Sequence, residues 1–365
     1  MKTDEHKLGY FFIVSASIFI VLAGIKSSAM IVVPFLLSLF ITILLLPLYN
    51  FFKTYKFGDT LSLVLVMLLF FSVVFGIAKF VGSSLHDFNA NMDIYAKQLN
   101  IYFLLVAQKL MSIGIEIPLE NFSGETNSKE IMSFATKVMQ GVGEIFSDGF
   151  VVLFSVIFML LESTLFSHKI NHITQNKGAS HHIRKIVEQI KEYMILKAMM
   201  SALTGFVIAV ALVALGVDYP FLWALVAFLF NFIPNIGSII AAVPAVLLTL
   251  VQLGPLYALV VSMVYVVVNI VVGSILEPKV MGKGLGLSSL VVFLSLVFWG
   301  WLLGIVGMLL SIPLTIMIKI VLDDNEKTRW IAVLLGTGKD IEQQKGKYDR
   351  KFRFIGSNFL NKRDV

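Results

Sequence analysis

The feature that most constrains this chain is a stretch from Tyr219 to Leu276 that contains no charged residue. A second uncharged stretch runs from Gly284 to Ile318. A helix that crosses a bilayer needs about 20 mostly apolar residues. Both stretches therefore predict membrane-spanning helices, and each is long enough to hold more than one membrane segment.

The composition agrees with a membrane protein of several spans. Of its residues 58% are hydrophobic and 14% charged, and the mean hydropathy is +0.88, whereas soluble proteins are about 45–50% apolar and about 25% charged. The net charge of +6 is attributed to Lys and Arg in cytoplasmic loops, and nucleic acid is not expected as a partner. Because the chain has no cysteine, disulfides, thiolate metal sites and cysteine nucleophiles are excluded.

The fold class predicted is an all-α polytopic membrane protein with about eight transmembrane segments in the lipid bilayer. Two of its features are helical hairpins broken by Gly and Pro, and a third is an extracytoplasmic helical hairpin between helices three and four. Besides the two long stretches, the apolar segments are Tyr10–Gly24, Ala29–Leu48, Thr60–Ala78, Gly149–Leu161 and Ala198–Val217. The expected parts are helices one to three in 1–80, the extracytoplasmic segment in 81–148, helix four with a basic cytoplasmic loop in 149–197, a transmembrane core with both broken hairpins in 198–320, and a basic cytoplasmic tail in 321–365.

The charges of the loops predict the orientation of the chain. The segment Lys79–Asp148 carries five Lys and eight acidic residues, whereas Ser163–Lys197 carries six Lys or Arg and two acidic residues. The tail from Lys319 is also basic, with eleven Lys or Arg against seven acidic residues. Because Lys and Arg accumulate in cytoplasmic loops, we expect both termini and the 162–197 loop in the cytoplasm and the 79–148 segment outside.

Apolar residues in the extracytoplasmic segment recur at helical spacing. A three-four spacing of this kind is typical of two helices that pack on each other. Packing within the hairpin is favoured over a coiled coil with a partner, which stays open as an alternative. The first series is Leu85, Phe88, Met92, Tyr95, Leu99, Tyr102 and Val106, and the second is Ile131, Phe134, Val138, Val142 and Ile145.

The first long stretch is interrupted near its middle by Asn231, Pro234, Asn235 and Gly237. Proline removes a helical hydrogen bond, and irregular backbone within a membrane survives only where protein or a polar cavity surrounds it. The two halves of Tyr219–Val251 are each near the lower length limit for spanning. The pattern predicts a re-entrant or broken helical hairpin.

The second stretch is interrupted in the same way between Trp299 and Gly307. Counting the helices places the two hairpins in opposite orientations, and paired broken segments of this kind point to a transport site. The alternative is two ordinary tight hairpins in which glycine permits close packing. The candidate residues of a solute path are Asn231, Pro234, Asn235, Gly237, Asn269, Gly304 and Gly307.

Ionisable residues near the core are few. Glu277 and Asp218 are the candidates for ion coupling, but both stand at segment ends, and an interfacial, structural Glu277 is favoured. Four histidines, among them His168 and His172, occur in the cytoplasmic loop, where a solvated face is favoured over a metal site. No metal, cofactor or enzymatic activity is expected, because the chain has no P-loop, G-x-S-x-G or H-E-x-x-H motif.

The interrupted segments resemble the autoinducer-2 exporter (AI-2E, PerM-like permease) family. The resemblance lies in Phe232–Gly237 with Pro244, in Glu277–Leu287, and in Phe298–Met308 with Pro313, and it is specific from about Gln189 to Ile320. It implies a bacterial inner-membrane permease of about eight helices that forms homo-oligomers, with pentamers expected. Members of the family are assigned either export of autoinducer-2 or sodium(lithium)/proton antiport.

Three functional hypotheses follow. Export of a small polar molecule of the autoinducer-2 type is favoured, because the hairpins are rich in Asn and Gly but poor in charge. A sodium(lithium)/proton antiporter would need a titratable carboxylate in the bundle, for which Glu277 and Asp218 are the candidates. A non-transporting membrane scaffold would act through the helical hairpin or the basic tail.

Overall fold

The computed structural model describes residues 2–55, 58–113, 125–147, 149–173, 177–234, 236–281, 286–324 and 328–337. Within these ranges the chain is helical and has no strand. Six helices in them are long and apolar enough to cross a membrane, and the shorter segments Phe12–Ser27, Gly149–Ser163 and Pro220–Phe230 are also apolar. The all-helical membrane class predicted from composition is thereby confirmed.

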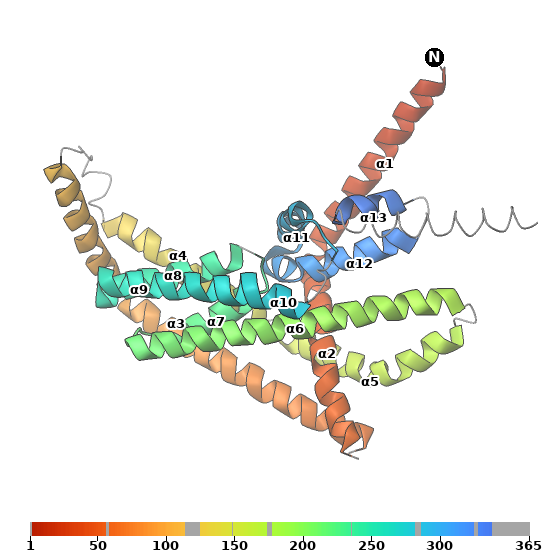
Figure 1. Ribbon diagram of the computed structural model, residues 1–365, viewed down its shortest axis with the longest axis horizontal. Helices are drawn as coiled ribbons and strands as arrows, with labels where there is room; N and C mark the ends of the chain where they lie inside the picture. The colour runs from red at the N-terminus through yellow and green to blue at the C-terminus, as the bar shows by residue number, and fades with distance from the viewer. Residues whose placement is uncertain are drawn as a thin grey trace, which may run out of the picture.

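The first two helices are α1 (Lys2–Ser27) and α2 (Ala29–Thr54). Helix α1 points away from the rest of the molecule in Figure 1 and exposes most of its apolar side chains. Helix α2 packs against α5 (Gly149–Ile173), where the buried Ser38 hydroxyl donates to the carbonyl of Val152 at 3.1 Å. A serine placed between two apolar helices permits this close approach and supplies the hydrogen bond that the membrane cannot.

Helix α3 (Asp59–Ser112) continues without interruption from the predicted third membrane segment into the predicted extracytoplasmic segment. It packs against α4 (Glu125–Ser147), and it is continuous with the predicted third membrane segment, so the first arm of the expected hairpin is not a separate element. Phe88, Tyr95 and Leu99 of the predicted series are buried, as expected.

Two residues of the predicted series lie elsewhere on the helix surface. Val106 is 57% exposed and Phe134 is 39% exposed, whereas Met132, Ala135 and Met139 are fully buried. The contact surface of α4 therefore lies to one side of the predicted one, because α4 also packs against α7 and α8. The side chain of Ile145 is outside the described residues.

The end of α5 adjoins the start of α6 (Lys177–Leu215) at one end of the long axis of the molecule, and the two helices diverge from there (Figure 1). The C-terminal end of α3 lies at the other end (Figure 1). Helix α6 then extends back through the molecule beside α9. Within it, Val187–Leu215 contains a stretch apolar enough to make it one of the candidate membrane spans.

The C-terminal half contains the interrupted segments. Helices α7 (Pro220–Phe230) and α8 (Ile236–Leu253) are followed by α9 (Pro255–Val268), the π-helical segment η2 (Asn269–Leu276) and α10 (Glu277–Met281). Helices α11 (Ser289–Leu309), α12 (Ser311–Asp324) and α13 (Arg329–Leu335) complete the described chain. Pro220 and Pro255 each stand at the first position of a helix, where the missing backbone N–H is not needed.

Candidate solute path

The first break separates α7 from α8 at residues 231–235, as the sequence predicts. The carbonyl of Phe230, at the end of α7, accepts from the N–H of Ile233 at 2.8 Å, and α8 begins at Ile236. A Cβ atom on Gly237 would lie 1.8 Å from the Phe230 carbonyl oxygen. The two arms therefore fold back on each other only because residue 237 has no side chain.

The second break is made by Gly304 and Gly307. Gly304 has φ 68° and ψ −149° inside α11, a backbone conformation that side chains of L-residues rarely adopt. A Cβ atom on Gly307 would lie 2.1 Å from the carbonyl oxygen of Trp299. As in the first break, a glycine in the second arm lies against a carbonyl at the end of the first arm.

The two breaks adjoin one apolar cluster. Phe232, in the first break, packs against a buried cluster that includes Leu303, Val306 and Leu310 of the second break. The same cluster includes Tyr193 of α6. The fold thus brings together two segments that are about 70 residues apart in the chain, next to the middle part of α6.

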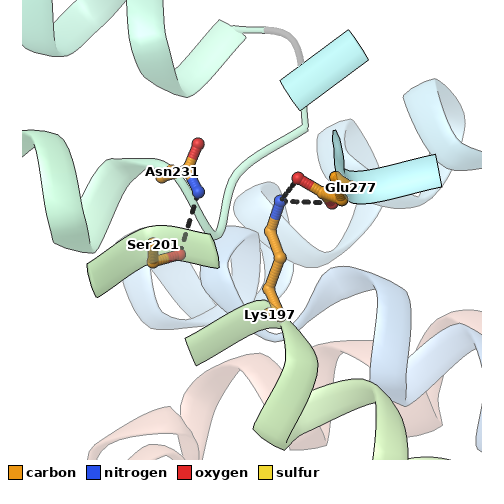
Figure 2. A network of polar contacts seen from close by, with 4 residues as sticks. All are labelled: Lys197, Ser201, Asn231 and Glu277. Carbon is orange, nitrogen blue, oxygen red and sulfur yellow. Dashed lines mark hydrogen bonds and ion pairs between the residues drawn. The ribbon is translucent and has the colours of Figure 1, made fainter. Parts of the chain in front are cut away.

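Asn231 is the first polar residue of the first break and is 8% exposed. Its side-chain amide nitrogen donates to the hydroxyl of Ser201 in α6 at 3.0 Å (Figure 2). Pro234 is half-buried, and its carbonyl accepts from the N–H of Ile236 at 2.6 Å. Asn235 lies outside the described residues.

Glu277 forms an ion pair with Lys197 of α6. The Lys197 amine nitrogen lies 2.7 Å from Oε1 and 2.9 Å from Oε2 of Glu277, and Figure 2 shows the two side chains pointing toward each other. The side chains of Lys197 and Glu277 are 5% and 17% exposed. This differs from the interfacial, water-facing position expected for Glu277, because a lysine from another helix neutralises the carboxylate.

In the sequence Lys197 directly precedes the apolar segment Ala198–Val217 as its charged end, and nothing there predicts its ion pair with Glu277. The part of α6 before Lys197 also carries Glu188, Lys191 and Glu192, so hydropathy gives no reason to single it out. A signal is present in the sequence, because four polar residues recur at helical spacing around Lys197. We name these four buried residues the α6 polar stripe: Tyr193, Lys197, Ser201 and Thr204.

Asp218 lies at the other end of α6, at a distance along the helix of about 30 Å from Lys197. Its carboxylate accepts from the hydroxyl of Tyr95 in α3 at 3.1 Å, and its backbone N–H donates to the side chain of Gln252 at 2.8 Å. Its carbonyl accepts from the indole N–H of Trp223 at 3.2 Å. The two carboxylates considered for ion coupling are thus far apart, and Asp218 joins α3 to the α6–α7 turn and the end of α8.

Asn269 begins the π-helical segment η2 and is half-buried. A Cβ atom on Gly273 would lie 3.2 Å from the Asn269 amide oxygen, so the side chain lies along the following turn. Single π-helical turns occur frequently at functional sites. Hydropathy gives no signal for this change of helix type, because Asn269–Leu276 is as apolar as its flanks.

Comparison with known proteins decides the family. Residues 11–327 match the AI-2E family transporter family. The chain belongs to this family. The AI-2 transport protein TqsA of Escherichia coli (strain K12) is 37% identical over 318 residues, which cover 87% of this chain and 92% of that protein.

Other relatives of the AI-2E chain have names that are less specific. A presumed transport protein of Haemophilus influenzae is 37% identical over 334 residues, which cover 90% of this chain and 96% of that protein. The presumed transport protein YhhT of Escherichia coli (strain K12) is 32% identical over 327 residues, which cover 89% of this chain and 93% of that protein. These are transport proteins rather than enzymes, so this AI-2E chain is a membrane permease, as the resemblance implied.

No group of three or more His, Asp or Glu residues that could hold a metal occurs among the residues that the structure describes. The side chains of His168, His172, His181 and His182 lie outside them. The described arrangement instead offers a buried polar surface within an apolar bundle. It can form hydrogen bonds with a solute, and its paired charges leave it neutral overall.

Proposed function

We propose that this AI-2E family protein exports a small, uncharged, polar solute of the autoinducer-2 type across the bacterial inner membrane. The path follows Asn231, Pro234 and Gly237 of the first break, Gly304 and Gly307 of the second, and Asn269 between them. The name of the E. coli relative, an AI-2 transport protein, supports the choice of cargo. The proposal includes about eight membrane segments, both termini in the cytoplasm, and a homo-oligomer, with a pentamer expected.

The observation that carries the proposal is the pair of glycine-dependent breaks. In both breaks a residue of the second arm is glycine, and any side chain there would overlap a backbone carbonyl of the first arm. The carbonyl is that of Phe230 in the first break and that of Trp299 in the second. Backbone that departs from a regular helix at membrane depth is tolerated where protein surrounds it or where it lines a polar cavity. Two such breaks beside the α6 polar stripe favour a solute path over plain packing.

The test is flux into proteoliposomes that contain the purified protein. Labelled autoinducer-2 should accumulate faster than in empty liposomes, and Asn231→Leu and Asn269→Leu should each reduce the rate by about tenfold, because each removes a polar group from the path. The control is Asn50→Leu at the exposed end of α2, which should transport normally. Equal rates in protein-containing and empty liposomes would refute the proposal.

Sodium(lithium)/proton antiport is the second candidate, and the observation that favours it is the burial of Glu277. A carboxylate inside a bundle can exchange a proton for a cation if it can leave its partner. Here both carboxylate oxygens lie within 3 Å of Lys197, so a cation would have to displace an amine. A pH-sensitive dye inside the same liposomes should therefore show no sodium-dependent change, and a change that disappears in Glu277→Gln would favour the antiporter.

A further inference from the structure

The α6 polar stripe occupies one face of α6, with its members three or four residues apart. Tyr193, Lys197, Ser201 and Thr204 are all less than 10% exposed. Two of them have partners on other elements, since Lys197 pairs with Glu277 and Ser201 accepts from Asn231. The stripe is therefore the surface on which the first break and α10 converge (Figure 2).

The other two members of the stripe are hydroxyl groups that lack a partner in the described part of the chain. The hydroxyl oxygens of Tyr193 and Thr204 are buried and form no hydrogen bond with any described residue. A buried polar group without a hydrogen bond is costly, so most such groups in proteins are paired. A solute that carries hydroxyl groups can satisfy both, and they lie on either side of the ion pair along α6.

The ion pair determines the net charge of this surface. A lone ammonium or carboxylate inside a membrane bundle attracts ions of opposite sign and repels ions of its own sign strongly, because the surroundings are of low dielectric constant. At 2.7 Å from the carboxylate, the charge of Lys197 is compensated. The surface thus presents hydrogen-bonding groups without net charge.

We propose that Lys197 and Glu277 are the charge filter of the solute path. Together they keep the α6 polar stripe neutral, so that it accepts uncharged solutes rich in hydroxyl groups and excludes anions and cations of the same size. This inference rests on the proposed function, since it assigns the charge selectivity of the same path. Each charge alone would convert the path to one that selects ions of the opposite sign.

The experiment compares three labelled solutes of similar size in proteoliposomes: erythritol, its carboxylate erythronate, and 1-amino-1-deoxyerythritol. The wild-type protein should pass erythritol and exclude both ions. Glu277→Gln leaves Lys197 uncompensated and should raise the erythronate-to-erythritol ratio by about tenfold or more. Lys197→Met should raise the ratio for the amine instead. The exchange Lys197→Glu with Glu277→Lys should restore the preference for erythritol.

The matched control is the exposed ion pair of Lys53 and Asp59, whose atoms lie 2.8 Å apart with side chains 45% and 63% exposed. Lys53→Met and Asp59→Asn make the same chemical changes and should leave all ratios unchanged. Unchanged ratios in Lys197→Met and Glu277→Gln, with erythritol flux retained, would overturn the charge filter and leave the proposed function standing. Failure of all three solutes to cross in the wild type would overturn the charge filter, and it would overturn the proposed function as well only if labelled autoinducer-2 also failed to cross.

A second measurement does not disturb the ion pair. Ser201→Cys introduces the only cysteine of the chain, one turn from Lys197, and keeps both charges. A small neutral thiol reagent should modify it, and erythritol should slow the modification. Absence of modification, or modification at the same rate with and without erythritol, would overturn the inference even if the charge variants failed to insert.

Discussion

Gly237 and Gly307 permit the two breaks because neither residue has a side chain. The backbone carbonyls of Phe230 and Trp299 occupy the positions that Cβ atoms would need, at 1.8 Å and 2.1 Å. Neither carbonyl can move without displacing the end of α7 or the middle of α11. The first break therefore depends on Gly237, and the second depends on Gly307 together with Gly304, which has φ 68°.

Gly237→Ala should destabilise the protein in detergent by about 2 kcal/mol or more, because the added methyl group forces the two arms apart. The control is Gly76→Ala in α3, where a Cβ atom would meet nothing within 4 Å. That change should alter the stability by no more than about 1 kcal/mol, and favourably, since alanine favours helix. Thermal unfolding measured on both variants checks the prediction, which equal unfolding temperatures would contradict.

The buried ion pair predicts a non-additive effect on stability. Lys197→Met and Glu277→Gln should each cost about 3–5 kcal/mol, because each leaves one charge buried without its partner. The double variant should cost much less than the sum, since no uncompensated charge remains. A double-mutant cycle of unfolding free energies measures this coupling, and additive costs would show that the two side chains do not interact energetically.

At the scale of the element, the helices that surround α4 determine which of its faces is buried. Helix α4 contacts α3, α7 and α8. Its fully buried apolar residues are accordingly Met132, Ala135 and Met139 in addition to the predicted Val142. The predicted Phe134 lies at the edge of the contact and is 39% exposed.

Met139→Ala should destabilise the hairpin by about 2–5 kcal/mol, because it leaves a cavity between α4 and its neighbours. Phe134→Ala removes more atoms but should cost under about 1 kcal/mol, since its side chain is partly exposed. Hydrogen exchange of the α4 amides in the two variants distinguishes these costs. A greater loss of protection in Phe134→Ala would place the contact on the face that the sequence pattern indicated.

At the scale of the whole molecule, the long axis separates two ends of different charge. The C-terminal end of α3 lies at one end, and the adjoining ends of α5 and α6 lie at the other (Figure 1). The segment at the first end is acidic and the loop at the second is basic. The orientation that the loop charges favour stays a prediction, which labelling of exposed positions on different helices tests.

Gln98→Cys on α3 and Trp330→Cys on α13 should therefore react from opposite sides of the membrane. Both positions are exposed, and the chain has no native cysteine to interfere. An impermeant thiol reagent should label only Gln98→Cys in intact spheroplasts and both variants after lysis. Labelling of Trp330→Cys before lysis would reverse the proposed orientation.

The sequence by itself determined the class of the protein and the places where its helices are interrupted. Uncharged runs of this length are compatible only with a membrane, and Pro234, Gly237, Gly304 and Gly307 act on the backbone of their own neighbourhood. The resemblance to the AI-2E family lies in segments that contain the same residues. These signals can be read from the sequence because each acts on neighbouring residues and does not depend on which other helices pack against it.

Only the tertiary structure decided which side chains meet. Lys197 and Glu277 are 80 residues apart in the chain. Hydropathy marks each as the end of a span, because an unpaired charge inside a membrane bundle is costly. Only the structure shows that each charge has a partner. The same holds for Ser201 with Asn231, for the buried face of α4, and for the 54-residue continuity of α3. These properties depend on how helices that are distant in the sequence pack against one another, so no single segment of the sequence predicts them.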